Sequence, residues 1–524
     1  MNSVPKQSNC ETALDAEVIL VGYGPTAVAA ANFLGAYGIK TIAFERYKDI
    51  YARARAVTVN DWTMRCFQSV GLDAALLKDM DPTNTLLWKT YSGKELMRIN
   101  LNKSTLGQPP SSMIYQPVME QTLRTGVERH ACVAVQFGKQ VTHVSQDAHC
   151  ASVEVTDVET GAKTTVRARY VLACDGGSSG VRTQLDIPLI GSTINTLWVV
   201  IDARVKKWWP ERHILKFWSD KQRPVVDIPL SLGNHRWEFP LSDKESEKDF
   251  ETKEQLWKML STMGITADHV DIHQHAFYRH HVRRAARWRE GRVFLLGDAA
   301  HMMPPWAGQG MQSGIRDSFN LCWKLRDVIK GRLPESVLDT YESERAPNVA
   351  MITDVSEELG RIIKMTMTGP EKIKAMVGGL LSKLKLPIPP SPLDKPPTIG
   401  KGWITGDISG KSAVGQMIAQ PRVSTSAGHR CRLDDLLGHD FVMLGDEVDP
   451  ASLLSAQERQ AWDALGTRYV AVRSAVGSAR GDTDIMDTEG TLLNWLRQRQ
   501  TKAVVVRPDR FVAAAYGTGL SVPK

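Results

Sequence analysis

Two glycine-rich turns contain the residues of this sequence that are best suited to chemistry. The segment Gly22-Tyr23-Gly24-Pro25-Thr26-Ala27 follows an apolar run, and Glu45-Arg46 ends a second apolar run after a helical stretch. In this spacing Gly22 allows a tight turn, Gly24 lets the backbone approach a pyrophosphate, and Ala27 lets a helix pack closely on its strand. Glu45 stands where a carboxylate accepts hydrogen bonds from ribose hydroxyls. The pattern predicts a dinucleotide site, and its place early in the chain suits the ADP half of FAD.

The second turn lies beyond the middle of the chain. An apolar run at 293–296 leads into Gly297-Asp298, and the segment Gly308-Gln309-Gly310-Met311 then opens an amphipathic stretch that favours a helix. Backbone N–H groups at the start of a helix attract negative charge, and Asp298 offers a carboxylate to a sugar hydroxyl. An ordinary strand-to-helix turn with a capping aspartate is the alternative, and the first signature favours the nucleotide site.

Two more features belong with these turns. Arg53 and Arg55 follow the second predicted strand, where guanidinium donors could reach a cofactor, with surface arginines as the alternative. The apolar run 170–174 predicts another buried strand, and Asp175-Gly176 follows it. Ligands of α/β proteins bind at the carboxyl ends of strands, so this turn is a further candidate.

The composition is that of a globular protein with several domains. The chain has 524 residues, of which 42% are hydrophobic and 23% charged, and its net charge of +7 is not concentrated in blocks. This excess fits an anionic cofactor and does not indicate nucleic-acid binding. No apolar run is long enough to span a membrane, and the first residues do not resemble a signal peptide. Seven cysteines without a Cys-x-x-Cys pair predict a reducing, cytoplasmic location without disulfides.

In residues from about 190 to 290, the predicted strands do not alternate with helices as they do in βαβ units. Strand-like runs alternate with turns at 197–203, 214–218, 225–230 and 236–241. Five of the fourteen tryptophans fall between Trp198 and Trp237, so we expect a mixed or antiparallel sheet with an aromatic face and a slot for an aromatic ring. A histidine group follows at His273, His275, His280 and His281. Because it has no Asp, Glu or Cys at ligand spacing, we predict no metal site.

The last part of the chain, from about 415 to 524, predicts a separate small α/β unit. A Pro-rich connector at 386–397 precedes it, and strands are expected at 440–444, 469–472 and 503–506. Its single cysteine, Cys431, has no Cys-x-x-Cys partner, so we expect no redox chemistry there. We expect a packing or dimerisation role, with a homodimer as the candidate assembly.

These motifs resemble those of the single-component FAD-dependent aromatic hydroxylases, the p-hydroxybenzoate hydroxylase-like flavoprotein monooxygenases. The resemblance covers nearly the whole chain and rests on the order of the Gly22 turn with Glu45, Asp175-Gly176 and Gly297-Asp298. Segments that are similar to the 3-(3-hydroxyphenyl)propionate hydroxylase branch lie at 115–117, 173–177, 303–310 and 507–513.

The resemblance implies an α/β fold with a Rossmann-like FAD-binding domain, an inserted mixed-sheet substrate domain and a thioredoxin-like C-terminal domain. The FAD-binding domain would take residues 1–190 and, with a helical connector, 291–400. The substrate domain would take 191–290, and the C-terminal domain 415–524.

The resemblance also implies roles for individual residues. Glu45 would hold the adenosine ribose, Asp298 the ribityl chain, and the backbone carbonyl of Pro305 would face the reacting oxygen. Asp175-Gly176 resembles a motif that contacts both FAD and the nicotinamide cofactor. At Gln312-Ser313 many relatives have an Asn instead. The expected cofactor contacts are Gly22, Gly24, Pro25, Ala27, Glu45, Arg46, Arg53, Arg55, Gln116, Asp175, Gly176, Gly297, Asp298, Gly308, Gln309, Gly310 and Met311.

The implied function is hydroxylation of a small phenolic substrate in aromatic catabolism, with FAD as cofactor and NADH or NADPH and O2 as co-substrates. In such enzymes reduced FAD and O2 form a flavin hydroperoxide, whose distal oxygen is transferred to the ring. One alternative is a hydroxylase of an N-heteroaromatic ring, or another flavin oxidoreductase of the same fold. The other is a non-catalytic flavoprotein that acts through its C-terminal unit.

Overall fold

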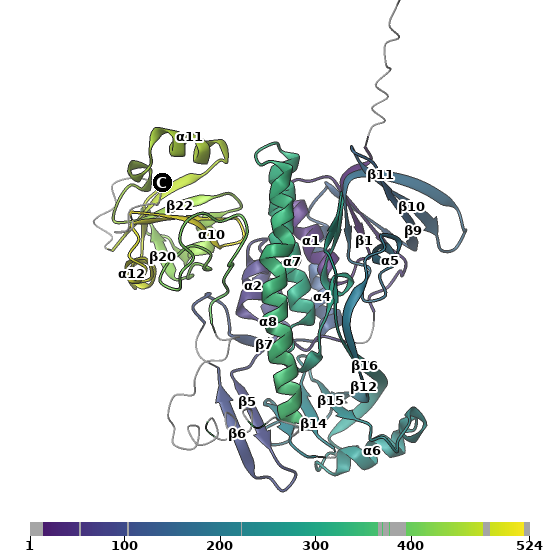
Figure 1. Ribbon diagram of the computed structural model, residues 1–524. Helices are drawn as coiled ribbons and strands as arrows, with labels where there is room; N and C mark the ends of the chain where they lie inside the picture. The colour runs from purple at the N-terminus through teal and green to yellow at the C-terminus, as the bar shows by residue number, and fades with distance from the viewer. Residues whose placement is uncertain are drawn as a thin grey trace, which may run out of the picture.

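The computed structural model describes residues 14–51, 54–101, 104–221, 223–364, 369, 377, 395–474 and 483–517. Arg53 and residues 386–394 of the expected connector lie outside these residues. The described chain forms three mixed sheets of seven or eight strands with long helices between them (Figure 1). The predicted α/β class is therefore confirmed.

The first sheet contains the strands that precede the predicted turns. Its order is β17-β18-β11-β1-β2-β8, and an antiparallel pair, β9 and β10, extends it beside β11. The path from β18 to β8 is parallel throughout, so the carboxyl ends of these strands meet at one edge. The strands are β1 (Ala16–Val21), β2 (Thr41–Glu45), β8 (Val133–Phe137), β9 (Lys139–Gln146), β10 (Ala151–Asp157), β11 (Lys163–Ala173), β17 (Arg289–Glu290) and β18 (Val293–Leu295).

Helix α1 (Pro25–Ala36) connects β1 to β2 and packs against α4 (Gln116–Val127) and α7 (Gly310–Ile329). Pro25 occupies its first turn, where a missing N–H costs nothing. The small side chains from Ala27 to Ala31 are fully buried, which allows α1 to lie close to α7. The other helices of this part are α2 (Asp61–Gln68), α3 (Asp73–Leu77), α5 (Gly180–Gln184), α6 (Lys253–Ser261) and α8 (Thr340–Ile363), with short 3-10 turns η1 (Glu247–Phe250), η2 (Gly297–Ala299), η3 (Pro305–Ala307) and η4 (Glu335–Asp339).

The second sheet is mainly antiparallel and contains all four strands expected between 190 and 290. Its order is β19-β16-β12-β15-β14-β13-β5-β6, so three strands from outside that range complete it. The predicted limits of 191–290 therefore leave out β5, β6 and β19. The strands are β5 (Thr85–Lys89), β6 (Glu95–Asn100), β12 (Leu189–Val205), β13 (Leu215–Trp218), β14 (Val225–Pro229), β15 (Asn234–Pro240), β16 (Val270–Ala285) and β19 (His301–Met302); a small sheet holds β3 (Thr58–Asn60), β4 (Asp81–Pro82) and β7 (Ser111–Met113).

The third sheet lies in the last part of the chain, in the order β21-β20-β24-β23-β22-β25-β26. Its middle strands β22, β23 and β24 are parallel, whereas β25 and β26 are antiparallel. Strands β22, β23 and β25 match the three that the sequence predicts. The elements are β20 (Arg422–Thr425), β21 (Arg430–Arg432), α10 (Leu433–Leu437), β22 (Val442–Asp446), η6 (Pro450–Leu453), α11 (Ala456–Ala464), β23 (Arg468–Arg473), β24 (Ile485–Met486), α12 (Thr491–Gln498), β25 (Ala503–Val506) and β26 (Val512–Tyr516).

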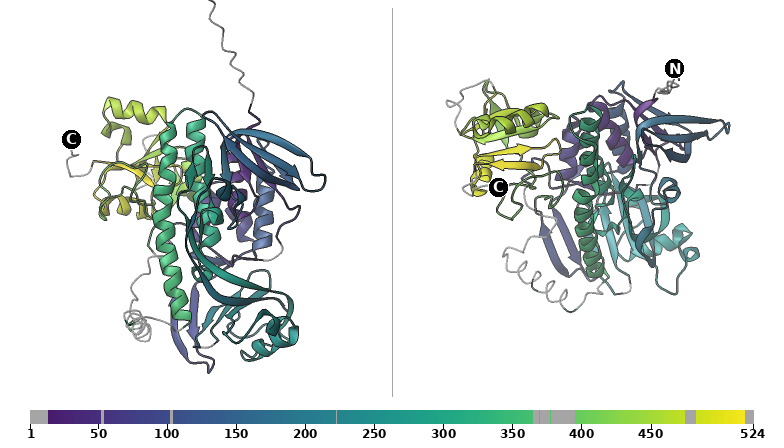
Figure 2. Two further views of the ribbon diagram at one scale, coloured as in Figure 1. Left: turned by 45° about the vertical axis from the view of Figure 1, so that its right-hand side comes forward. Right: turned by 45° about the horizontal axis from the view of Figure 1, so that its top comes forward.

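The third sheet shares a hydrophobic core with the first part of the chain. Trp323 of α7 lies 5.6 Å from Phe441 and 6.0 Å from Trp403, measured between ring centroids. Figures 1 and 2 show α7 and α8 between the first and the third sheet, with the lower end of α8 beside the second sheet. The unit expected to be separate is thus packed against α7. A Pro-rich connector predicts where an element ends, but not which surface the next element covers.

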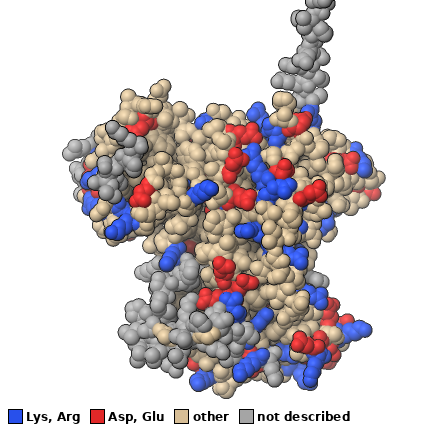
Figure 3. All heavy atoms as spheres, in the orientation of Figure 1, with Lys and Arg blue, Asp and Glu red and all other residues tan. Residues whose placement is uncertain are grey.

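Charged side chains of both signs are spread over the face of the molecule that Figure 3 shows. Basic and acidic side chains are interspersed there. Among the helices that the structure describes, none combines the length and apolar character needed to cross a bilayer.

Candidate functional site

The predicted turns meet at the carboxyl edge of the first sheet. Val21 of β1 is paired with Ala173 of β11 and with Phe44 of β2, and Ala173 is paired with Leu295 of β18. The turns that follow these strands are therefore neighbours although they come from four parts of the sequence. The structure brings together Gly22, Gly24, Glu45, Asp175, Gly176, Gly297 and Asp298.

Glu45 ties the first turn to the end of β2. Its carboxylate accepts a hydrogen bond from the Tyr23 N–H at 2.7 Å and another from the Tyr47 N–H at 2.9 Å. A carboxylate has about four acceptor sites, so capacity is left for the hydroxyls of a sugar. The backbone of Gly22 has φ of +85°, and a Cβ there would lie 2.8 Å from the Cys174 carbonyl oxygen. Glycine is thus required for the turn to pass β11.

The Gly297-Asp298 turn is fixed from behind by a buried carboxylate. Asp317 of α7 accepts hydrogen bonds from the Gly297 N–H at 3.1 Å, from His301 Nε2 at 2.7 Å and from Arg345 Nε at 2.8 Å. Burial opposes the ionisation of Asp317, but His301 and Arg345 hold its pKa below the usual value. His301 is buried and engaged in this network, so it is a structural residue.

Asp298 itself accepts no hydrogen bond from any described residue. Its side chain is exposed, yet protein surrounds it closely enough to raise the pKa of the carboxyl above its usual value. His301 and Arg55 lie near enough to oppose this increase in pKa.

Close packing sets the position of Asp298 relative to α1. A Cβ on Gly297 would lie 2.6 Å from Thr26 Oγ1, and a Cβ on Gly314 would lie 2.2 Å from the same atom. Thr26 of α1 is therefore in contact with both the turn and helix α7. The two nucleotide signatures of the sequence are joined at this point.

The loop after β2 is held by Gln116 at the start of α4. Its side-chain carbonyl accepts hydrogen bonds from the Arg55 N–H at 2.7 Å and the Ala56 N–H at 2.8 Å. The guanidinium of Arg55 lies over the Tyr51 ring, and the guanidinium of Arg46 lies over the ring of Tyr47. Gln116 thus positions the Arg55 loop, and Arg46 is exposed beyond Glu45.

The segment from Gly308 to Met311 forms the start of α7, and Gln312 fixes it. Gln312 Nε2 donates to the Gly308 carbonyl at 2.7 Å, while its Oε1 accepts from the Asn60 N–H and Thr63 Oγ1, both at 2.9 Å. The residue at the position where many relatives have Asn is therefore a buried link between this loop and α2. Gln309 precedes the helix without a side-chain cap, which leaves first-turn N–H groups available to an anion.

Pro305 lies on an exposed turn that is attached to α8. Ser356 Oγ donates to the Pro304 carbonyl at 2.7 Å, and the Ala307 N–H donates to Ser356 Oγ at 3.3 Å. The Pro305 carbonyl accepts the Gly308 N–H at 2.7 Å. The next residue, Trp306, packs on an aromatic face of the second sheet.

Asp175 caps the segment that follows β11. Its Oδ2 accepts the Val181 N–H at 3.1 Å, whereas its Oδ1 is buried without a partner among the described residues. Burial raises the pKa of this carboxyl. Gly176 has open space where a Cβ would be, so a ligand can approach its backbone.

A flavin dinucleotide fits this set of donors and acceptors. A Cβ at Gly24 would meet no atom within 4 Å, and α1 begins there without a side-chain cap or an acidic residue in its first turn. Free N–H groups at a helix start suit a pyrophosphate. The unpartnered carboxylate of Asp298 suits a polyol.

Several residues of this site were not named from the sequence. Asp317 and Thr26 act through contacts between α1, the turn and α7, and Ser356 comes from a helix 50 residues further along the chain than the turn it holds. The only signal for Asp317 is an acidic residue among the apolar positions of an amphipathic helix.

Comparison with known families gives two matches. A family model described as "FAD binding domain" matches residues 15–356, and one described as "HcaD C-terminal domain" matches residues 415–520.

Curated relatives match over nearly the full length. A 3-(3-hydroxy-phenyl)propionate/3-hydroxycinnamic acid hydroxylase of Burkholderia cenocepacia is 35% identical over 512 residues, which cover 95% of this chain and 93% of the relative. The enzyme with the same name from Mycobacterium avium is 33% identical over 521 residues, which cover 96% of this chain and 89% of the relative.

Two solved structures are similar across 97% of each chain, with a TM-score of 0.78. They are the flavin-dependent monooxygenase PieE with FAD and substrate, at 22% identity, and aklavinone-11 hydroxylase with FAD and aklavinone, at 21%. At this level of identity the likeness shows a common fold.

Proposed function

Because this chain belongs to the family of FAD-dependent aromatic hydroxylases, we propose that it hydroxylates a phenol with a short carboxylate side chain, as 3-(3-hydroxyphenyl)propionate has. O2 would supply the oxygen atom. The curated relatives above are named for this acid and for 3-hydroxycinnamic acid, and they match almost the entire chain. A hydroxylase of a phenolic acid is the function that these names and the site support best.

We propose that the carboxyl edge of the first sheet holds FAD. The adenosine ribose would bind Glu45, the pyrophosphate would lie at Gly24 and the start of α1, and the ribityl chain would bind Asp298. The isoalloxazine ring would lie beside the segment from Gly308 to Met311. The open backbone at Gly24 and the unpartnered Asp298 support this placement.

When bound, FAD accepts hydride from NADH or NADPH and, with O2, provides the oxygen atom for the ring. The protein's own residues bind the cofactor, orient the substrate and shield the reacting atoms from water. Ser356 and Gln312 hold the two ends of the turn that contains Pro305. Trp88, Trp198 and Phe217 form a buried aromatic cluster in the second sheet, and Trp306 of the Pro305 turn packs against Trp198.

We propose the domain division that the sequence suggests, with two adjustments from the sheet topology. A Rossmann-like FAD-binding domain would contain the first sheet, and the second sheet would be an inserted substrate domain that also takes β5 and β6. The third sheet, with parallel β22 to β24 followed by antiparallel β25 and β26, supports a thioredoxin-like domain. This domain would be packed against α7 of the FAD-binding domain and would not be an independent unit.

The observation that carries the proposal is Asp298, an exposed carboxylate with no described donor, on a turn that packs against Thr26 in the first turn of α1. In the test, purified holoenzyme is mixed with NADH or NADPH, with and without 3-(3-hydroxyphenyl)propionate. We expect oxidation that depends on the phenol and a product heavier by one oxygen atom. Coenzyme oxidation without any oxygenated product would contradict a hydroxylase acting on this substrate.

Asp298→Ala tests the placement of the cofactor. The loss of one charge-assisted hydrogen bond corresponds to about 1.5–3 kcal/mol, so FAD affinity should fall by about tenfold to more than a hundredfold. Equilibrium dialysis of FAD measures this, with Asp243→Ala, at an exposed position of the second sheet's loops, as the matched control. If Asp298→Ala retained the FAD affinity of the control, Asp298 would only shape a turn.

A further inference from the structure

A cation lies among aromatic rings at the point where the Pro305 turn meets the second sheet. Lys364 Nζ at the end of α8 lies 5.0 Å from the ring centroid of Trp306 and 5.8 Å from that of Trp198. The His280 ring of β16 lies 5.4 Å from each of these two indoles. We call Lys364, His280, Trp198 and Trp306 the Lys364 cluster.

Three buried nitrogens of the Lys364 cluster have no hydrogen-bond partner within the described chain. His280 Nδ1 and the indole nitrogens of Trp198 and Trp306 are buried and make no hydrogen bond. His280 is 9% exposed, so water does not readily satisfy it. Indole N–H groups without partners also occur at Trp237 and Trp323, so the tryptophans alone indicate nothing. The unpartnered histidine beside a lysine distinguishes this cluster.

Lys364 also lacks the partner that a half-buried ammonium usually has. No carboxylate among the described residues lies within ion-pair distance of it, and the indole faces are its only described contacts. Burial lowers the pKa of Lys364, and burial together with Lys364 and His281 lowers the pKa of His280 to about 4. At neutral pH the imidazole of His280 is therefore neutral.

The cluster adjoins the proposed cofactor site. Trp306 follows Pro305 on the turn that leads to Gly308, and it fits against α8 where Gly360 has no side chain, since a Cβ there would lie 2.2 Å from the indole. Trp198 belongs to the aromatic face of the second sheet together with Trp88 and Phe217. Trp198, Trp88 and Phe217 are buried, so a substrate ring would reach these polar groups from the side of Trp306 and Lys364, which are only partly buried.

We propose that the Lys364 cluster receives an oxyanion of the aromatic substrate. This inference rests on the proposed function and adds the residues that recognise the charge. Lysine and indole nitrogens only donate hydrogen bonds, and a neutral imidazole donates one, so the cluster offers donors and a positive charge to its ligand. An anion completes the pairing of Lys364, whereas a cation would be repelled by it.

Two groups of a phenolic acid could be that anion: the carboxylate of its side chain or the ionised hydroxyl on its ring. Three probes separate them. 3-(3-Hydroxyphenyl)propionate has both groups, 3-phenylpropionate has only the carboxylate, and 3-ethylphenol has only the hydroxyl. Their dissociation constants are measured on holoenzyme from the change in flavin absorbance, without turnover.

The variant Lys364→Met keeps the length of the side chain and removes its charge. For a half-buried ion pair we expect binding of the charged probe to weaken about tenfold to a hundredfold. A weakening of both carboxylates with 3-ethylphenol unchanged identifies the carboxylate. A weakening of both phenols with 3-phenylpropionate unchanged identifies the ring oxygen. Lys364→Arg should restore most of the affinity.

The control Lys258→Met removes an exposed lysine of α6 and should bind all three probes as wild type does. FAD content of each variant confirms that the cofactor site is intact. Wild-type affinity of Lys364→Met for all three probes would overturn the subsite alone. If wild-type holoenzyme bound none of the three probes, both the proposed substrate class and the subsite that rests on it would be contradicted.

Discussion

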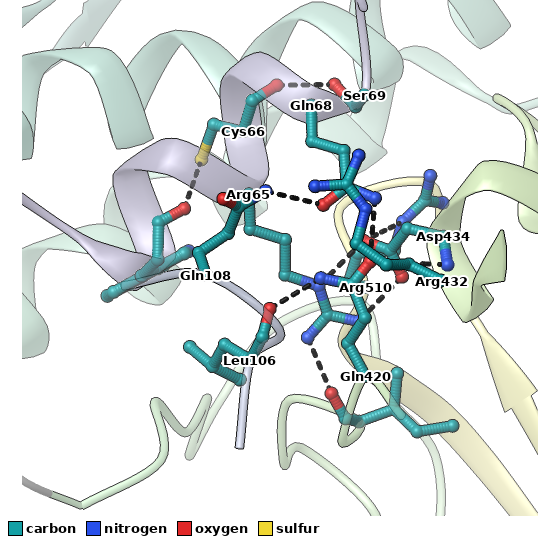
Figure 4. A network of polar contacts seen from close by, with 12 residues as sticks. Arg65, Cys66, Gln68, Ser69, Leu106, Gln108, Gln420, Arg432, Asp434 and Arg510 are labelled. Carbon is teal, nitrogen blue, oxygen red and sulfur yellow. Dashed lines mark hydrogen bonds and ion pairs between the residues drawn. The ribbon is translucent and has the colours of Figure 1, made fainter. Parts of the chain in front are cut away.

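A buried carboxylate joins the third sheet to α2, and its removal should destabilise the whole protein. Asp434 at the start of α10 forms two hydrogen bonds with Arg65, at 2.7 Å to Nε and 2.8 Å to the second guanidinium nitrogen. Arg510 Nε lies 3.1 Å from the same carboxylate. All three side chains are at most 1% exposed, and Figure 4 shows them converging.

The magnitude follows from the charges that would be left behind. Burial opposes the ionisation of Asp434, but Arg65 and Arg510 hold its pKa below the usual value, so the group is a carboxylate at neutral pH. Asp434→Asn keeps the shape and leaves two buried guanidinium groups without an anion. Breaking a buried pair in this way costs about 3–5 kcal/mol in the free energy of unfolding.

Urea unfolding measures this change, followed by tryptophan fluorescence and by the fluorescence of released FAD. The slope for a chain of this size exceeds the value of about 1–3 kcal/mol per molar of small proteins, so the loss lowers the midpoint by roughly 1 M or less. The control is Arg430→Met, which removes an exposed ion pair with Glu489 in the same part of the chain and should cost less than about 1 kcal/mol. If both variants unfolded at the same urea concentration, the buried pair would not hold the third sheet in place.

Two shorter predictions follow from the cysteine and the histidines. Cys431→Ser should leave phenol-dependent NAD(P)H oxidation unchanged, because no other described cysteine is bonded to Cys431 and burial raises the pKa of its thiol. A large loss of rate with normal FAD content would contradict this prediction. Burial lowers the pKa of both His280 and His439 from 6.5 to about 4, so the unfolded chain binds more protons between these values. The free energy of unfolding should therefore fall as the pH decreases from about 6.5 to 4, by up to about 3 kcal/mol per histidine. An unchanged urea midpoint between pH 7 and pH 5 would refute this prediction.

The parts of the site that were predictable from sequence are those defined by short spacing. The turn from Gly22 to Ala27 needs its glycine because β11 passes 2.8 Å from where a Cβ would be, and such a constraint leaves a local pattern. Glu45 and Asp298 follow apolar runs that are long enough to predict as strands. The family, the aromatic hydroxylase activity and FAD, all inferred from these motifs, are confirmed by the full-length relatives.

The remaining parts depend on contacts between distant segments. Asp317 stabilises the Gly297 N–H from within α7, and Lys364 meets Trp198 only because α8 extends to the second sheet. Strands β5 and β6 join that sheet from a region that the sequence assigns to the first domain, since pairing partners are not encoded by hydrophobic alternation. The individual cofactor contacts, including Arg53 outside the described residues, stay predictions.

The same contacts connect the third sheet with the loop proposed for the flavin ring. Helix α2 is bonded to the third sheet through Arg65 and Asp434, and at its other end the Asn60 N–H donates to Gln312. Gln312 in turn donates to the carbonyl of Gly308, in the loop proposed for the isoalloxazine ring. A series of hydrogen bonds therefore runs from the third sheet through α2 to this loop, and it contains no thiol.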